Sequence, residues 1–362
     1  MSIAQHIVNE RFYGAKSQTI NDVEIVREKA LGENTLVIAR INDVLYQLLV
    51  DPEGKDVLVN HVDEVQDSLG SWISSGDFPA GPYQALSGEQ SNTSLVAGDV
   101  MVKYFRKLEP GLNPDVELLS QIPDCPHVAP VLGYSSVDLD GSDYTLVMSQ
   151  RFMPGADGWK HALSTTAGSF ADEARLLGEA TASVHVALAE AFDTTLVPSA
   201  EVADGLVSRL DNLIGQAPDL ARYREDAVAV YRELDGEVEL QRIHGDLHLG
   251  QTLRTTTRYI LIDFEGEPAR PLAERKLPDS PLRDIAGMLR SLDYAAHFDG
   301  VHKAWGEEAA SAYLQGYGAV DRHRSLLDAY ILDKALYEVA YEINNRPDWV
   351  HIPLGAVERV LG

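Results

Sequence analysis

Three oxygen-bearing side chains occur close together in the sequence, in a pattern that suits phosphoryl transfer. Asp246 and Gln251 belong to the run His244-Gly245-Asp246-Leu247-His248-Leu249-Gly250-Gln251, and Asp263 follows a short apolar stretch. Transfer of a phosphoryl group to a hydroxyl requires a carboxylate that orients the hydroxyl and accepts its proton, and a tight loop would present Asp246 for that role. Mg²⁺ prefers hard oxygen ligands, so the amide oxygen of Gln251 and the carboxylate of Asp263 are suitable ligands. Gly245 would allow the loop to turn sharply, and a hairpin would then bring Asp263 beside Gln251.

The same residues have a structural alternative. A single His-x-Asp sequence is usually a polar turn between two core strands, with its acidic side chains in solvent. Here an apolar strand and Asp263-Phe264-Glu265 follow the turn at the separation that a hairpin needs, which favours the catalytic interpretation. His248 either hydrogen-bonds the loop or contacts the acceptor. Glu265 is either a further metal ligand or a neighbour of one.

The elements that would position these residues change from strands to helices along the chain. Residues 20–50 alternate apolar and polar side chains, which predicts a β-meander. A stretch rich in Gly, Ser and Pro at 71–84 indicates a boundary. A mixed sheet is expected next, with strands at 100–105, 128–134 and 144–148 and a helix at 114–121. Apolar residues then recur at three- and four-residue spacing, which predicts helices at 170–192, 202–213, 218–234, 283–296, 306–317 and 324–345, interrupted by short strands within 240–264.

Composition limits the partners of the chain. Its 362 residues include 56 acidic and 30 basic side chains, and the net charge of −26 would repel nucleic acids and anionic membranes. No run of about 18 apolar residues occurs, the first ten residues do not resemble a leader peptide, and the single cysteine, Cys125, excludes an intrachain disulfide. We therefore expect a cytoplasmic protein that would hold a polyanion such as a nucleotide through Mg²⁺, a few lysines and backbone N–H groups.

The two loops together resemble the catalytic and metal loops of the aminoglycoside-phosphotransferase-like kinases. Within that family the sequence is most similar to the actinobacterial glucosamine kinases and maltokinases, which are sugar kinases. This closer similarity rests on the stretches 89–94, 111–117, 279–284, 289–296 and 337–338 and on the start Arg11-Phe12-Tyr13-Gly14. The resemblance implies an α+β, bilobal, protein-kinase-like fold. Its parts would be an N-terminal β-rich cap at 1–80, a mixed-sheet, nucleotide-binding N-lobe at 81–150 and a helical C-lobe at 151–362.

The resemblance also implies ATP and Mg²⁺ as the cofactors and assigns the nucleotide contacts. A turn at 89–94 would cover the phosphates, although it carries small polar residues where a protein kinase has glycines. Lys103 would reach the phosphates and pair with Glu117 on the following helix. A hinge after the last strand of the sheet would meet the adenine. The residues expected to bind the nucleotide are Lys103, Glu117, Ser91, Asn92, Thr93, Ser94, Gln150, Phe152 and Met153.

For the acceptor, the resemblance points to the C-terminal helices facing Asp246. Carboxylates and aromatic rings suit sugar hydroxyls, and a protonated amine would add a reason for negative charge. Two of the acids, Glu338 and Glu342, share one helical face, so either a substrate cation or the nearby Lys334 and Arg346 would compensate them. The residues expected to bind the acceptor are Asp246, His248, Asp293, Tyr294, Glu338, Tyr341 and Glu342.

The chain is shorter than the maltokinase pattern, which indicates a different acceptor pocket. We therefore expect glucosamine, phosphorylated at its 6-hydroxyl, ahead of maltose, phosphorylated at its anomeric hydroxyl. An alternative of another class is a nucleotide-binding pseudokinase. Asp284 is expected to brace the catalytic loop, and His185 to be a hydrogen-bonded core histidine. A monomer or weak dimer is expected.

Overall fold

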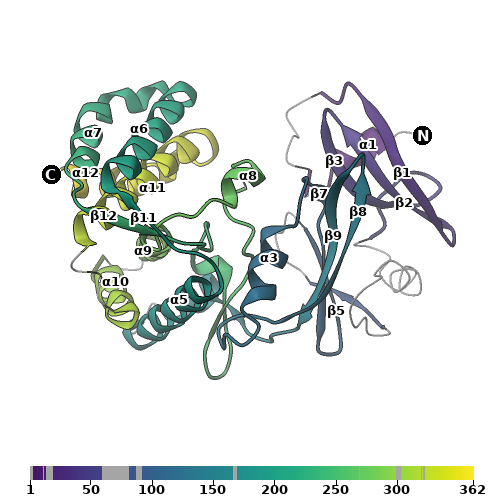
Figure 1. Cartoon of the computed structure of the whole chain (residues 1–362), viewed down its shortest axis with the longest axis horizontal. Helices are drawn as coiled ribbons and strands as arrows, with labels where there is room; N and C mark the ends of the chain where they lie inside the picture. The colour runs from purple at the N-terminus through teal and green to yellow at the C-terminus, as the bar shows by residue number, and fades with distance from the viewer. Residues whose placement is uncertain are drawn as a thin grey trace. The chain divides into compact units, whose positions relative to one another are not determined.

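The computed structural model describes most of the chain (Figure 1). The described residues are 3–10, 12–13, 19–58, 81–86, 92–165, 169–268, 270–298, 303–318, 320 and 323–362. Residue contacts divide the chain into two compact units, Met1–Pro123 with Ala129–Met153 and Asp124–Val128 with Pro154–Gly362. The finer division into a cap, an N-lobe and a C-lobe remains a prediction, and most of the expected boundary at 71–84 lies outside the described residues.

The predicted β-meander forms the first sheet of the first unit. It consists of β1 (Val23–Leu31), β2 (Asn34–Ile41) and β3 (Val44–Val50), with the short strand β7 (Lys107–Leu108) beside β3, and all the pairs are antiparallel. The turn between β2 and β3 is made by Asn42 and Asp43, whose φ angles are 45° and 68°. Asn and Asp tolerate this left-handed conformation better than other side chains do, so these two residues fix the register of the hairpin.

Strands β2 and β3 are buried on both faces of the first sheet, and successive residues of a strand point to opposite sides. Val37 and Ala39 of β2 pack into one apolar core together with Ile7 of the short helix α1 (Ile3–Ile7). Ile38 points to the other face and joins a core that also contains Val102 of the second sheet. The meander and the second sheet are thus held together by shared apolar contacts.

The second sheet has the strand order β4-β5-β6-β9-β8. Its strands are β4 (Gln84–Ala85), β5 (Thr93–Ala97), β6 (Val100–Tyr104), β8 (Val131–Leu139) and β9 (Ser142–Arg151). The register of β5 on β6 places Ser94 opposite Lys103. The predicted helix between the strands is confirmed as α3 (Pro114–Gln121), which begins at Asn113, whose side chain accepts a hydrogen bond from the N–H of Asp115.

The second unit is mainly helical, as predicted, and α6, α7, α11 and α12 gather at one end of it (Figure 1). Short strands separate the helices and form two small sheets, β10-β13-β14 and β11-β12. The predicted segment 218–234 begins as a 3₁₀ turn, and α4, α8 and α12 were not predicted. The elements are α4 (Gly158–Ser164), α5 (Ala171–Ala191), α6 (Ser199–Gln216), η1 (Pro218–Tyr223), α7 (Arg224–Arg232), η2 (Leu249–Gln251), α8 (Leu272–Arg275), α9 (Leu282–His297), α10 (Lys303–Tyr317), α11 (Arg324–Asn345), η4 (Pro347–Trp349) and α12 (His351–Leu361), with β10 (Ala156–Asp157), β11 (Thr195–Pro198), β12 (Glu237–Leu240), β13 (Thr252–Arg254) and β14 (Tyr259–Leu261).

Two glycines allow α5 and α10 to approach each other closely. A Cβ atom on Gly178 of α5 would lie 2.1 Å from the carbonyl oxygen of Tyr313, and one on Gly316 of α10 would lie 2.0 Å from that of Arg175. Any side chain at these positions would force the helices apart. Among the described residues, every helix is too short or too polar to cross a membrane.

Candidate active site

The run from His244 to Gln251, predicted to be the catalytic loop, forms a tight turn on the surface of α9. Gly245 adopts a φ of 84°, a conformation that favours glycine, so the sharp turn expected from the sequence is present. The backbone N–H of Leu249 donates to the hydroxyl of Ser291 on α9, over 3.1 Å. The loop is therefore attached to the helix on which it lies.

Asp284 braces this loop, as predicted. Its two carboxylate oxygens accept hydrogen bonds from the backbone N–H groups of His244, at 2.8 Å, and Gly245, at 2.9 Å. His185 lies in the core, where its Nε2 donates to the same carboxylate over 3.0 Å and its Nδ1 accepts from the hydroxyl of Tyr317. Burial alone would raise the pKa of the Asp284 carboxyl, but the hydrogen bond from His185, the neighbouring His244 and the hydrogen bond from the Gly245 backbone outweigh burial and lower the pKa. The brace is consequently a carboxylate anion.

The buried ring of His244 connects the catalytic loop to the strand that precedes Asp263. Its Nε2 donates to the carbonyl oxygen of Ile262, at 2.9 Å, and its Nδ1 accepts from the N–H of Asp246, at 3.3 Å. One imidazole thus fixes the spacing between the two predicted functional acids. This role was not predicted, although the position of His244 two residues before Asp246 was the available signal.

The predicted hairpin brings Asp263 beside Gln251. Ile262 N–H donates to the carbonyl oxygen of Gln251, and the side-chain Nε2 of Gln251 donates to Asp263 Oδ2 over 3.1 Å. Asp263 has a φ of 66°, which is unusual for a residue other than glycine and turns its carboxylate away from the regular strand direction. Its neighbour Glu265 is half-buried.

The residues of this hairpin fit the Mg²⁺ ion that the resemblance implies. The hydrogen bond between Gln251 and Asp263 uses the amide nitrogen and leaves the amide oxygen for a ligand role. Amide and carboxylate oxygens are the hard donors that Mg²⁺ prefers. Gln251 and Asp263 would hold such an ion, with Glu265 as the candidate third ligand. The three metal assignments remain predictions.

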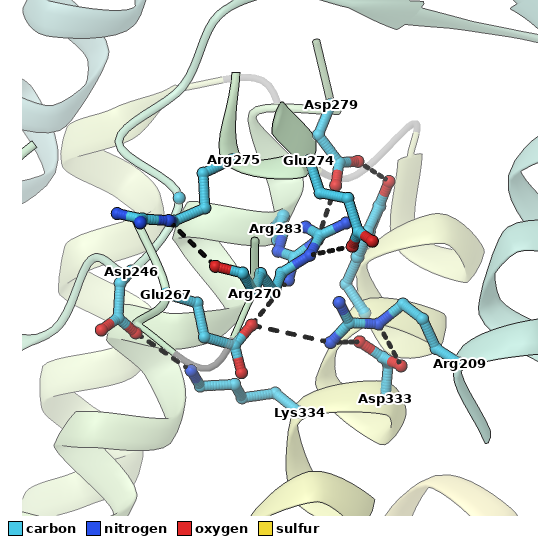
Figure 2. Close-up of polar contacts among 12 residues, drawn as sticks. Arg209, Asp246, Glu267, Arg270, Glu274, Arg275, Asp279, Arg283, Asp333 and Lys334 are labelled. Carbon is cyan, nitrogen blue, oxygen red and sulfur yellow. Dashed lines mark hydrogen bonds and ion pairs between the residues drawn. The ribbon is translucent and has the colours of Figure 1, made fainter. Parts of the chain in front are cut away.

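Lys334 of α11 reaches Asp246 (Figure 2). Its ammonium group lies 3.2 Å from Asp246 Oδ1, and both side chains are partly buried. Burial acts to raise the pKa of Asp246, but the positive charge and hydrogen bond of Lys334, together with the neighbouring His248 and His244, outweigh burial, so the net pKa lies below the ordinary value. Asp246 is therefore ionised and can accept a proton. The sequence had offered Lys334 as a partner of Glu338, and its contact with Asp246 was missed.

A network of ion pairs surrounds Glu267, just beyond the predicted metal loop (Figure 2). The carboxylate of Glu267 is 3.0 Å from Arg283 and 3.8 Å from Arg209. Arg209 of α6 also contacts Asp333, which precedes Lys334 on α11. The network joins the end of the metal loop to the helix that carries the partner of Asp246.

His248 hydrogen-bonds the catalytic loop, which is one of the two roles considered for it from the sequence. Its Nδ1 accepts from the N–H of Gly250 at 3.0 Å and caps the short helix η2. Burial lowers the pKa of the His248 imidazole, so the ring is neutral and can act as this acceptor. A role in acceptor binding remains a prediction.

The acids expected to bind the acceptor are neutralised within the protein. Glu342 of α11 pairs with Arg346 at 2.6 Å, one of the two compensating cations considered from the sequence. Glu338 forms its ion pair with the buried Arg290 of α9, at 2.7 Å, and the charge of Lys334, the other cation considered from the sequence, adds a smaller favourable contribution. Burial raises the pKa of Glu338 despite this partner.

The other predicted acceptor residues belong to the same two clusters. Asp293 shares Arg290 with Glu338, and the hydroxyl of Tyr294 donates to Glu342 at 3.0 Å. Tyr341 is 45% exposed. The structure thus groups these side chains on α9 and α11, and their contact with a sugar remains a prediction.

In the first unit, Lys103 is held by an acid of α3. Its ammonium lies 2.7 Å from Asp115 Oδ2, and both groups are buried. The helix was predicted to supply the partner, but Asp115 was not singled out, and the pairing with Glu117 stays a prediction. Thr93 and Ser94 are buried at the start of β5.

The remaining predicted nucleotide contacts lie around the phosphate turn and the hinge. Asn92 accepts a hydrogen bond from a backbone N–H, whereas Ser91 lies outside the described residues. Gln150 is buried at the end of β9. The N–H of Phe152 already donates to the carbonyl oxygen of Asp99, so an adenine contact at Phe152 would use another of its groups, and Met153 follows it.

Comparison with known proteins identifies related sequences and a shared fold. The chain is 28% identical to a glucosamine kinase of Streptacidiphilus jiangxiensis over 77% of this chain and 73% of the relative. It is 26% identical to a glucosamine kinase of Mycolicibacterium smegmatis over 81% of this chain and 82% of the relative. A solved glucosamine kinase in complex with glucosamine, ADP and inorganic phosphate superposes with a TM-score of 0.71 at 19% identity, covering all of both chains. That likeness shows the fold, which is the kinase-like α+β fold expected from the sequence.

A family model matches residues 83–328, a range that contains Lys103, the catalytic loop and the metal loop. The chain belongs to the phosphotransferase enzyme family.

Proposed function

We propose that this protein is a Mg-ATP-dependent sugar kinase that transfers the γ-phosphoryl group to the 6-hydroxyl of glucosamine. The observation that carries the proposal is the ionised Asp246, held in a braced loop and tied through His244 to the hairpin of Gln251 and Asp263. The two relatives named as glucosamine kinases support the choice of acceptor.

In the reaction, Asp246 orients the sugar hydroxyl and accepts its proton while the hydroxyl oxygen bonds to the γ-phosphorus. The bond from that phosphorus to the bridging oxygen breaks, and ADP leaves. Mg²⁺ held by Gln251 and Asp263 would neutralise negative charge on the phosphates. Lys334 favours the ionised form of Asp246 before the transfer, and Lys103 would supply a positive charge for the nucleotide.

Release of ADP in a coupled assay with glucosamine, maltose, glucose and an aminoglycoside tests the proposal. We expect glucosamine to have the highest kcat/KM, with the phosphate on carbon 6 as shown by phosphorus–proton coupling in the product. Preference for maltose would identify a maltokinase. Nucleotide binding without ADP release from any sugar would support the pseudokinase alternative and contradict the proposal.

Asp246→Asn tests the assigned base. We expect kcat to fall by roughly 10²- to 10⁴-fold, the usual contribution of a positioned general base, with nucleotide affinity nearly unchanged. The ion pair with Lys334 is partly exposed, so stability should change by less than about 1 kcal/mol. The exposed Asp219→Asn, on η1, is the control. An unchanged kcat in Asp246→Asn would remove Asp246 from the mechanism.

A further inference from the structure

Arg106 lies three residues after Lys103 and is completely buried in the first unit. Its guanidinium forms an ion pair with Asp56 and stacks on the ring of Phe12, with 4.0 Å from Cζ to the ring centre. Asp56 in turn accepts from the N–H of Leu49 on β3 at 3.0 Å. The side chain of Arg106 is thus anchored to the meander and to the N-terminal segment.

The backbone of Arg106 makes two further connections. Its carbonyl oxygen accepts from the N–H of Gln47 on β3, at 2.8 Å, and its N–H donates to the side-chain oxygen of Asn92, at 3.1 Å. Asn92 is the first described residue of the phosphate turn predicted at 89–94 and directly precedes β5. One residue therefore connects the first sheet to the start of the strand that follows this turn.

The buried ion pair of Arg106 and Asp56 carries an energetic cost. Nε and Nη1 of Arg106, and both polar atoms of the Gln47 side chain, are buried without a hydrogen-bond partner among the described residues. Buried polar atoms of this kind carry a desolvation cost, and buried ion pairs can often be replaced by apolar residues without loss of stability. An apolar residue at this position could not form the ion pair with Asp56, and this ion pair fixes the position of the Arg106 backbone.

We propose that Arg106 is a positioning residue for nucleotide binding, which holds Asn92 and the start of β5 in place and uses the meander as its anchor. The proposal rests on the proposed kinase function. The anchor is distinct from Lys103, whose own partner is Asp115. Loss of the anchor should loosen Asn92 and the start of β5 and weaken ATP binding, while leaving the acceptor side of the reaction intact.

The test is the double variant Arg106→Met with Asp56→Asn. It leaves no unpaired charge in the core, and the amide oxygen of the new Asn can still accept from Leu49. We expect KM for ATP to rise about tenfold, equivalent to about 1.4 kcal/mol, with KM for the sugar and kcat within about twofold of the parent values. Arg106→Lys, which retains the charge but not the planar stacking group, should give a smaller rise and serves as the conservative variant.

Amide hydrogen exchange supplies a second measurement that needs no substrate. Exchange at Asn92–Ala97 should accelerate in the double variant, while exchange in α5 stays as in the parent. Arg40→Met on β2 is the matched control because Arg40 forms an exposed ion pair with Glu24 in the same sheet. We expect it to change neither KM for ATP nor exchange at 92–97.

The outcomes separate this proposal from the proposed function. A parent protein that phosphorylates no sugar contradicts the kinase assignment, and exchange at Asn92–Ala97 then decides whether Arg106 holds the start of β5. Parent-like exchange there, or a lower melting temperature with unchanged KM for ATP, would overturn the positioning role. If the double variant fails to fold, the same two measurements on Arg106→Lys decide the question.

Discussion

Gly287 of α9 is the point at which the helix meets the backbone of the predicted catalytic loop. A Cβ atom at this position would lie 2.5 Å from the carbonyl oxygen of Leu247, the residue after Asp246, whereas ordinary contacts begin at 3.4 Å. In Gly287→Ala the helix and the loop must therefore separate by about 0.9 Å. The loop cannot avoid the new atom by rotating a side chain, because the contact is with backbone.

The displacement should reduce catalysis more than it reduces stability. Misplacement of a catalytic group by about 1 Å can cost roughly 10²-fold in rate, and we expect a fall of that size in kcat for Gly287→Ala. Overpacking typically costs about 1–3 kcal/mol, part of which is offset because alanine favours a helix by about 1 kcal/mol over glycine. The measurements are kcat in the coupled assay and the melting temperature.

Gly205→Ala on α6 is the matched control. The same methyl group would meet no atom within 4 Å there, so this variant should gain about 0.5–1 kcal/mol of stability and keep its kcat. If Gly287→Ala is folded and turns over within twofold of the parent, then the close contact between α9 and the loop does not set the position of Asp246, and the reasoning fails.

Two other substitutions test the surroundings of the same loop. Both carboxylate oxygens of Asp284 accept hydrogen bonds from loop N–H groups, and in Asp284→Asn one of these oxygens becomes an NH₂ group that can only donate. We therefore expect kcat to fall by roughly 10²-fold. The free energy of unfolding should drop by about 3–5 kcal/mol, as measured by thermal unfolding. A parent-like melting temperature would show that the brace contributes little. Lys334→Met removes the charge that lowers the pKa of Asp246 and leaves burial, which raises it. Asp246 is active as a base only above its pKa, so the acid limb of the kcat/KM profile should move to higher pH in this variant, and an unmoved limb would exclude control by Lys334.

Local sequence patterns were sufficient to predict most of the fold. The alternation at 20–50 specified the meander, and the apolar periodicity specified the long helices, because each side-chain period matches one backbone geometry. The order His244–Gln251, apolar strand, Asp263 predicted the hairpin that the structure contains. The interpretation of Asp284 as a brace was also confirmed.

The partners of the charged groups were harder to predict because they depend on which helices pack together. Arg290 and Glu338 are 48 residues apart and lie on different helices, so no local spacing connects them. Lys334 was considered only with neighbours on its own helix, whereas it reaches Asp246 in a distant loop. The choice of Asp115 as a partner for Lys103 likewise depends on how α3 lies against β6. Spacing within one element predicts which residues share a face, and it does not predict what that face meets.

The pairing of charges also explains how a chain with a net charge of −26 can bind a polyanionic nucleotide. At physiological ionic strength, charges farther away than about 8 Å are largely screened, so the surface acids have little effect on a bound phosphate. Under the proposed function the local environment would be set by Lys103, held in place by Asp115, and by Asn92, which accepts from the N–H of Arg106. Because long-range attraction is absent, affinity for the nucleotide must come from how firmly these few groups are positioned. That requirement gives a physical reason for placing an ion pair as costly as Arg106–Asp56 in the core of the first unit.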